Sequence, residues 1–164
     1  MSGAEAPLVD VVLLGLPVDL HQEATEHQDE LRREFSLMVR NDHGGADGVP
    51  HRLVALLAEL DDRFAQFGSA PARALADAHA RGEHRIDVVF RVPPRAREAS
   101  LELGRLFDEA DRFCRDGTHL LALATPPGPL AFRRWFLREF VVQIDGTAEP
   151  TAWDDSSFAA DLVR

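Results

Sequence analysis

The chain contains seven histidines, and their spacing relative to carboxylates decides whether they suit a metal. His21-Gln22-Glu23 has the His-x-Glu half of a zinc deaminase signature, but the cysteine pair that completes such a site is missing. His21 and His27 also miss the spacing of the zinc protease motif. On a helix, Glu23, His27 and Glu30 would share one face and offer carboxylate and imidazole ligands. In the alternative that we favour, His27 is a half-buried, hydrogen-bonded residue and the glutamates are solvated, so we expect no metal.

Nucleophiles and phosphate-binding loops are equally scarce. The segment from Gly44 to Gly48 has neither the Gly-x-Gly spacing nor the lysine of a phosphate cradle, and there is no Gly-x-Ser-x-Gly elbow. The single cysteine, Cys114, lies on the apolar stripe of an expected helix, which is typical of a small buried side chain rather than an activated thiol. We therefore expect no catalytic residue, no cofactor and no enzymatic activity.

A first cluster of arginines is a candidate binding site. Arg91 ends an expected strand, and Arg95 and Arg97 occupy the first turn of the helix after it. A cation at this position opposes the helix dipole, and a bound phosphate or carboxylate would remove that penalty. The three arginines are therefore a possible anion site. The alternative is pairing with acidic neighbours in the protein itself, such as Asp87 or Glu98.

A second cluster lies in the last expected helix, where the chain reads Phe132-Arg133-Arg134-Trp135-Phe136. Arginine next to large aromatic residues is typical of the hot spots of protein interfaces. Arg133, Arg134 and Trp135 are therefore a possible protein interface. The alternative is a core helix whose arginines reach solvent.

Composition limits the partners. The 164 residues include 18 basic and 28 acidic side chains, a formal net charge of -10. Such a field repels nucleic acid and anionic membrane surfaces. No apolar run is long enough to span a bilayer, and no positively flanked leader precedes Leu8, so we expect a cytoplasmic protein that binds neither nucleic acid nor membrane.

The elements that must position these residues follow from apolar periodicity. Short apolar runs predict strands at 8–16, 86–92 and 119–125. Asp19 and Gln22 have the form of a capping box, which predicts a helix from there to before Gly44. Apolar stripes at three- and four-residue steps predict further helices at 50–68, 69–81, 94–115 and 130–144.

This order of elements predicts one α/β or α+β domain, in which a small sheet of about three strands packs with about five helices. Residues 1–7 are expected to form a loose lead, 8–146 the globular domain and 147–164 an acidic, irregular tail. The expected core comprises Leu13, Leu31, Phe35, Leu57, Leu60, Val89, Leu103, Leu106, Phe107, Leu121 and Leu137.

The last expected helix is apolar nearly all round, so part of its surface needs a second cover. Either the tail folds back with Trp153, or another chain covers the helix. Because the tail has few apolar residues, we favour a second chain, and therefore expect another protein or a second copy as partner.

Several segments of the sequence are familiar as a set, namely Leu14–Leu20, Arg33–Phe35, Arg91–Pro94, Leu106–Asp111, Phe113–Cys114, Leu123–Pro127 and Phe132–Phe136. Together they resemble an uncharacterised actinobacterial family associated with partner-switching regulators. These regulators are histidine-kinase-like ATPase anti-sigma factors, their STAS-domain antagonists and the matching phosphatases. It implies a regulatory setting and transfers no active-site residue. The element order is also distantly similar to that ATPase fold, but the adenine loop of the fold is absent, so ATP binding is expected to be lost.

The sequence therefore predicts a non-enzymatic, cytoplasmic regulatory or protein-interaction domain in partner-switching signalling. The alternative is a sensor of a small ligand or anion, or a degenerate nucleotide-binding domain, that uses the arginine-lined turn at 91–97.

Overall fold

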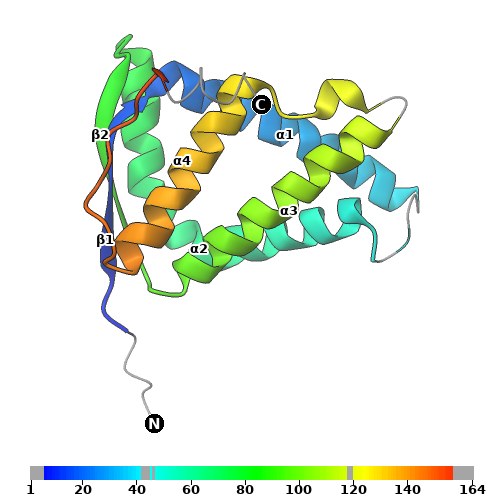
Figure 1. Ribbon diagram of the computed structural model, residues 1–164, viewed down its shortest axis with the longest axis horizontal. Coiled ribbons are helices and arrows are strands. Elements are labelled where there is room, and N and C mark those ends of the chain that lie inside the picture. Colours follow the sequence, from blue (N-terminus) through cyan, green and yellow to red (C-terminus); the bar gives the residue numbers. More distant parts are fainter. Residues whose placement is uncertain (1–5, 42–44, 46, 118–119, 157–164) are drawn as a thin grey trace.

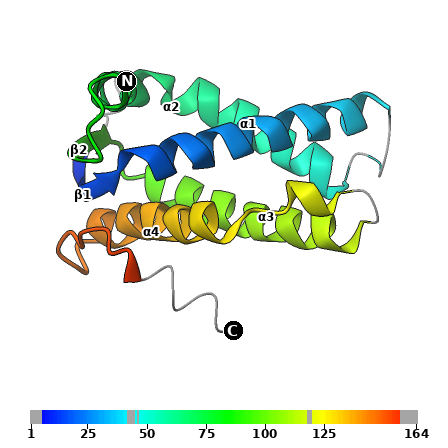
Figure 2. The same ribbon diagram turned by 90° about the horizontal axis from the view of Figure 1, so that it is seen from above.

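The computed structural model describes residues 6–41, 45, 47–117 and 120–156. The elements in chain order are β1 (Val9–Pro17), α1 (Val18–Arg40), α2 (Val49–Ala80), β2 (Arg85–Val92), α3 (Ala96–Asp116), the short 3-10 helix η1 (Leu121–Leu123) and α4 (Pro127–Ile144). The two strands pair at one end of the molecule, and the α-helices extend from one face of this small sheet (Figure 1). Seen from above, α1 and α2 form one layer and α3 and α4 the other (Figure 2). The prediction of a single domain is confirmed, and its class is α+β.

The strands β1 and β2 pair antiparallel, with Val11 opposite Phe90 and Val12 opposite Val89. Side chains alternate across a strand, which directs Val11 and Val88 into the core and Val89 outward. Val89 is 52% exposed, so its predicted place in the core is wrong. The apolar run around it has no clear alternation, and an error of one residue in the period-two pattern reverses the face of every side chain.

The strand predicted at 119–125 is not formed in the described residues. His119 lies outside them, and Leu121–Leu123 form η1 instead. The backbone N–H and the hydroxyl of Thr125 both donate to Oδ1 of Asp111, at 2.9 and 2.6 Å, which ties this segment to α3 rather than to the sheet. Leu121 is 67% exposed, so its predicted burial is also wrong. A short apolar run lacks the length that would separate a strand from a turn.

The helices predicted at 50–68 and 69–81 are one helix, α2. Gly68 does not take the left-handed conformation with which glycine ends helices. Pro71 lies inside the helix and is buried, and because it has no N–H, it removes one helical hydrogen bond. Figure 1 shows that α2 bends along its length, as helices do at an internal proline. The sheet is therefore packed with four α-helices and η1 in the described part of the chain, rather than about five helices.

The remaining helices lie close to their predicted ranges. α1 begins one residue before Asp19, with Pro17 in the N-cap position and no side-chain cap, so the predicted capping box is wrong. α3 matches its predicted range to within two residues at its start, and Cys114 is fully buried on it. α4 begins at Pro127, earlier than predicted, because proline fits the first turn of a helix. No helix among the described residues has the length and apolar character needed to cross a bilayer.

The core consists of two clusters. The sheet cluster joins the inner faces of β1 and β2 to α4 and to the second half of α2, and includes Leu13, Val88, Phe132 and Trp153. The helix cluster joins α1, the first half of α2, and α3. Of the predicted core, Leu13, Leu31, Phe35, Leu57, Leu106 and Phe107 are buried, whereas Leu60, Leu103 and Leu137 are partly buried.

Candidate functional site

The chain reverses direction at the end of α4. Gly146 has a positive φ of 66°, and its N–H donates to the carbonyl of Gln143 at 3.1 Å, while the N–H of Thr147 donates to the carbonyl of Val142 at 3.0 Å. These two bonds and the left-handed glycine form a Schellman ending. Residues 147–156, named here the C-terminal segment, then run back beside β1 (Figure 1).

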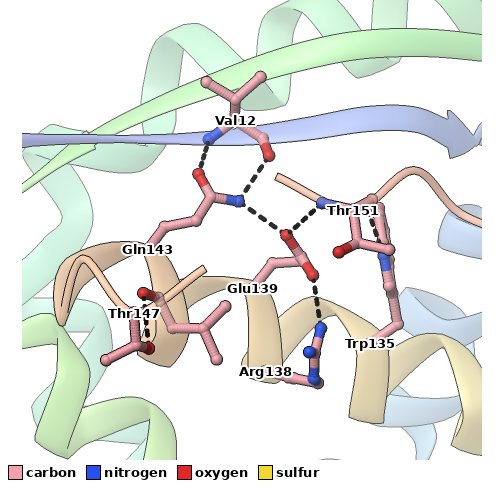
Figure 3. A network of polar contacts seen from close by, with 8 residues as sticks. Val12, Trp135, Arg138, Glu139, Gln143, Thr147 and Thr151 are labelled. Atoms are coloured by element: carbon pink, nitrogen blue, oxygen red, sulfur yellow. Dashed lines mark hydrogen bonds and ion pairs between the residues drawn. The ribbon is translucent and has the colours of Figure 1, made fainter. Parts of the chain in front are cut away.

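β1 pairs with β2 along one edge, and α4 satisfies part of its other edge (Figure 3). The side-chain amide of Gln143 accepts from the N–H of Val12 at 2.8 Å and donates to the carbonyl of Val12 at 2.8 Å. Further along this edge, the backbone N–H of Trp153 donates to the carbonyl of Leu14 at 3.0 Å. One glutamine and the C-terminal segment thus occupy hydrogen-bonding positions that a neighbouring strand would fill.

Glu139 links this edge to the C-terminal segment. Its side chain is fully buried, and its Oε2 accepts from Nε2 of Gln143 at 2.8 Å and from the backbone N–H of Thr151 at 3.0 Å (Figure 3). Arg138 donates to Oε1 at 3.0 Å. A buried carboxylate is tolerable only when it is paired and hydrogen-bonded, and here the C-terminal segment supplies one of those bonds.

Trp153 anchors the C-terminal segment. Its side chain is 5% exposed, and its ring lies edge-on to Trp135 at 5.5 Å and beside Phe132 at 6.1 Å between centroids. The indole N–H of Trp135 donates to the carbonyl of Thr151 at 2.9 Å, and that of Trp153 donates to Asp155 at 2.8 Å. We call the surface formed by β1 and α4 under these residues the β1–α4 groove.

A charged contact lies at the far end of the groove. Arg85 on β2 donates to Asp155 at 2.5 Å and to the carbonyl of Gly15 at 3.2 Å. Both charged side chains are largely exposed, and exposed ion pairs contribute at most about 1 kcal/mol. This pair therefore helps to orient the C-terminal segment but adds little to the free energy that holds the segment in place.

Trp153 covers the apolar surface of α4 at Trp135. The predicted cover by a second chain is therefore wrong at this position. The small number of apolar residues in the tail was misleading because a single tryptophan fills this space. Glu139, Gln143 and Thr151 were not among the residues predicted for the site. A signal was present, since Glu139 and Gln143 are four residues apart and are the two polar residues of the helix besides its three arginines, and a helix brings such a pair together.

Of the second arginine cluster, only Trp135 lies in the groove. Arg133 lies on another side of α4, where it donates to Asp111 at 2.8 Å and to Asp108 at 3.2 Å, and its guanidinium lies over Phe107 at 4.9 Å. Burial raises the pKa of Asp111, but hydrogen bonds from Thr125 and Arg133 outweigh it and hold the pKa below its ordinary value. Arg134 is on the exposed side of α4.

The first arginine cluster does not meet at one point. Arg91 pairs with Asp10 at 3.2 Å, and Arg97 pairs with Asp145 at 2.6 Å. The guanidinium of Arg95 lies over the ring of Phe64 at 5.8 Å. The alternative of pairing within the protein thus holds for Arg91 and Arg97, although with other carboxylates than expected, and the anion site stays a prediction.

Reactive chemistry has little support in the described residues. They contain no group of three His, Cys, Asp or Glu side chains that could hold a metal, and Glu23 and Glu30 are exposed beside the half-buried His27. Burial raises the pKa of the Cys114 thiol to about 11, so this cysteine stays protonated and unreactive. The arrangement around β1 and α4 is suited to binding.

Comparison of the chain with protein-family models found no match, and comparisons with curated proteins and with solved structures found none either.

Proposed function

We propose that this chain is a non-enzymatic, cytoplasmic regulatory domain that binds another protein by accepting an extended segment of it in the β1–α4 groove. The supporting observation is the C-terminal segment itself, which occupies the groove through backbone hydrogen bonds and one buried tryptophan. Recognition of extended peptides at strand edges works in this way, since main-chain bonds supply affinity and side-chain pockets supply specificity.

The contacts of the C-terminal segment define the segment that a partner must present. An aromatic side chain takes the place of Trp153 between Phe132 and Trp135. A backbone amide two residues earlier reaches Glu139, and a carboxylate two residues later reaches Arg85. The expected partner is therefore a protein with an extended aromatic-x-acidic segment.

A groove that exchanges one extended segment for another also fits the partner-switching setting that the sequence resemblance implies. The alternative function, an anion sensor at 91–97, has less support because Arg91 and Arg97 already pair with Asp10 and Asp145. A nucleic-acid partner is disfavoured by the net charge of -10.

The test uses the full chain with Trp153→Ala, which weakens the internal occupant of the groove. A labelled peptide of residues 147–156 should bind this variant more tightly than it binds the wild-type chain, because the wild-type groove is already filled. The same peptide carrying Trp153→Ala is the matched control and should bind neither. Fluorescence anisotropy measures all four combinations, and circular dichroism verifies that the variant chain is folded.

A folded Trp153→Ala chain that ignores the wild-type peptide contradicts the proposal. Hydrogen exchange of the wild-type chain gives an independent test. The amides of Thr151 and Trp153 should exchange faster than the amides by which β1 and β2 pair, because an exchangeable segment must detach without global unfolding. Equal protection of both sets would mean that the segment is a permanent part of the core. Capture of binding proteins from the native host by the Trp153→Ala chain would then identify the partner.

A further inference from the structure

A cavity of about 210 Å³ lies where α2, β2, α3 and α4 meet, and it is partly open to solvent. Its walls are almost wholly apolar. Five of the ten phenylalanines of the chain line it, namely Phe64, Phe67, Phe90, Phe136 and Phe140. Because an engineered apolar cavity of about 150 Å³ binds benzene, this volume is sufficient for an aromatic ring or a short alkyl chain.

Gly68 leaves part of this space open. It lines the cavity from the middle of α2, and a Cβ atom there would meet no atom of the described residues within 4 Å outside its own turn of the helix. Glycine inside a helix is less favourable than alanine, and here neither a positive φ nor a close neighbour requires it. The cavity therefore contains room that a side chain of the protein could occupy and does not.

Phe64 lies at the mouth of the cavity. It lines the wall but is only partly buried, and the guanidinium groups of two exposed arginines, Arg63 and Arg95, lie 5.5 and 5.8 Å from the centre of its ring. Arg63 pairs with Glu59 at 2.8 Å. Arg95 forms no ion pair with a described residue, unlike the other two arginines of its cluster. One positive charge without a carboxylate partner in the described chain is therefore present at the mouth.

An apolar cavity with a cation at its mouth matches a molecule that is apolar at one end and carries one negative charge at the other. Burial of that charge would be costly, so the charged end stays at the surface beside Arg95. The net charge of -10 repels anions from a distance, but salt at about 0.15 M screens charges beyond about 8 Å. We propose that this cavity binds a small amphiphilic monocarboxylate, such as a medium-chain fatty acid, with its chain among the phenylalanines and its carboxylate beside Arg95. This inference does not depend on the protein binding proposed for the β1–α4 groove.

The experiment compares octanoate with 1-octanol, which has the same chain length and no charge. Each is titrated into the full chain and followed by two-dimensional amide NMR. Octanoate should bind the wild-type chain at one site, and Arg95→Gln should weaken its binding about two- to fivefold, the effect of one exposed ion pair, without changing that of 1-octanol. Arg91→Gln is the matched control, because Arg91 pairs with Asp10, and it should change neither affinity. Failure of octanoate to bind the wild-type chain, or an Arg95→Gln variant that affects both probes equally, overturns the proposal.

Two matched variants locate the site, because Gly68 lines the cavity and Ala70 is exposed on the same helix. Gly68→Leu should block both probes, and Ala70→Leu should leave both bound; octanoate binding that survives Gly68→Leu overturns the assignment. A measurement on the wild-type chain remains decisive if Gly68→Leu does not fold. The terminal methyl group of bound octanoate should show intermolecular nuclear Overhauser effects to the buried Phe140, and the methylene group next to its carboxylate should show them to Phe64. The reverse order, or the absence of both effects, also overturns the proposal.

Discussion

Replacing Asp111 with asparagine removes one charge next to Arg133 and leaves the shape of the side chain nearly unchanged. The asparagine carbonyl still accepts from the backbone N–H and the hydroxyl of Thr125, but its amide nitrogen faces the guanidinium, donor against donor. Arg133 is 12% exposed and Asp111 4% exposed as side chains, so water cannot replace the lost partner. Asp108 remains at 3.2 Å, but it is half-exposed. Breaking a buried pair from one side costs about 3–5 kcal/mol, and we expect a loss in this range.

The matched control is Asp145→Asn, which removes the partner of Arg97 at a comparably short distance but in a pair that is about one-third exposed. We expect this variant to lose about 0.2–1 kcal/mol. Urea unfolding followed by circular dichroism gives both free energies, and an unchanged slope with denaturant shows that the two variants unfold from the same kind of native state. Equal losses at Asp111 and Asp145 would refute the reasoning from burial. The double variant Asp111→Asn/Arg133→Met should be more stable than Asp111→Asn alone, because no uncompensated charge remains.

Four further predictions concern the burial of Leu106, the lowered pKa values of two histidines and of Asp111, and the possible anion site. Leu106→Ala should lower the free energy of unfolding by about 2–5 kcal/mol, whereas Leu37→Ala on the exposed side of α1 should change it little; similar losses would mean that the packing of α3 is misassigned. Burial lowers the pKa of both His21 and His27 below the ordinary 6.5, so the unfolded chain takes up protons first, and stability should be complete above about pH 6.5 and fall as the pH drops below it. For His27, burial is the largest effect on the pKa; the negative charges of Asp111 and Glu30 oppose it, and the positive charge of Arg133 adds to it. The double variant His21→Asn/His27→Gln should flatten the fall in urea midpoint between about pH 7 and pH 5. The contribution of Asp111, whose pKa is lowered from the ordinary 3.8, should be lost only in a separate step as the pH falls below about 3.8. Finally, ATP should leave the melting temperature unchanged; an increase that Arg95→Ala abolishes would instead favour the anion site at 91–97.

The sequence predicts the long amphipathic helices well because their stripes persist over many turns. Phe35 and Phe107 are buried where the three- and four-residue steps place them. It predicts short apolar runs poorly, since Val88 and Val89 are chemically equivalent and only pairing with β1 decides which one faces inward. The strand predicted at 119–125 is wrong for a related reason. Hydrogen bonds tie Thr125 to Asp111, and such a tertiary contact leaves no periodic pattern in the sequence.

The candidate site is less visible in the sequence than the fold. Trp135 was predicted because arginines and aromatic residues lie next to it in the sequence. Its partners Trp153 and Thr151 lie beyond the end of the helix. The chain reversal at Gly146 brings them back, and this reversal depends on backbone geometry. Arg133 shows the opposite error. It was grouped with Trp135 because the two are close in sequence, yet a helix turns residues two apart to different sides, and Arg133 contacts Asp111 instead.

The bonds of Gln143 to Val12 join residues separated by 131 positions. During synthesis, at about 5–20 residues per second, the ribosome adds the intervening residues over roughly 7 to 26 s. Throughout that interval the backbone of β1 has neither Gln143 nor Trp153 on its outer edge, and an uncovered strand edge promotes aggregation. The earliest strand to emerge is thus among the last parts of the molecule to be completed. Translation speed and chaperone supply should therefore affect how much of this protein folds without aggregating.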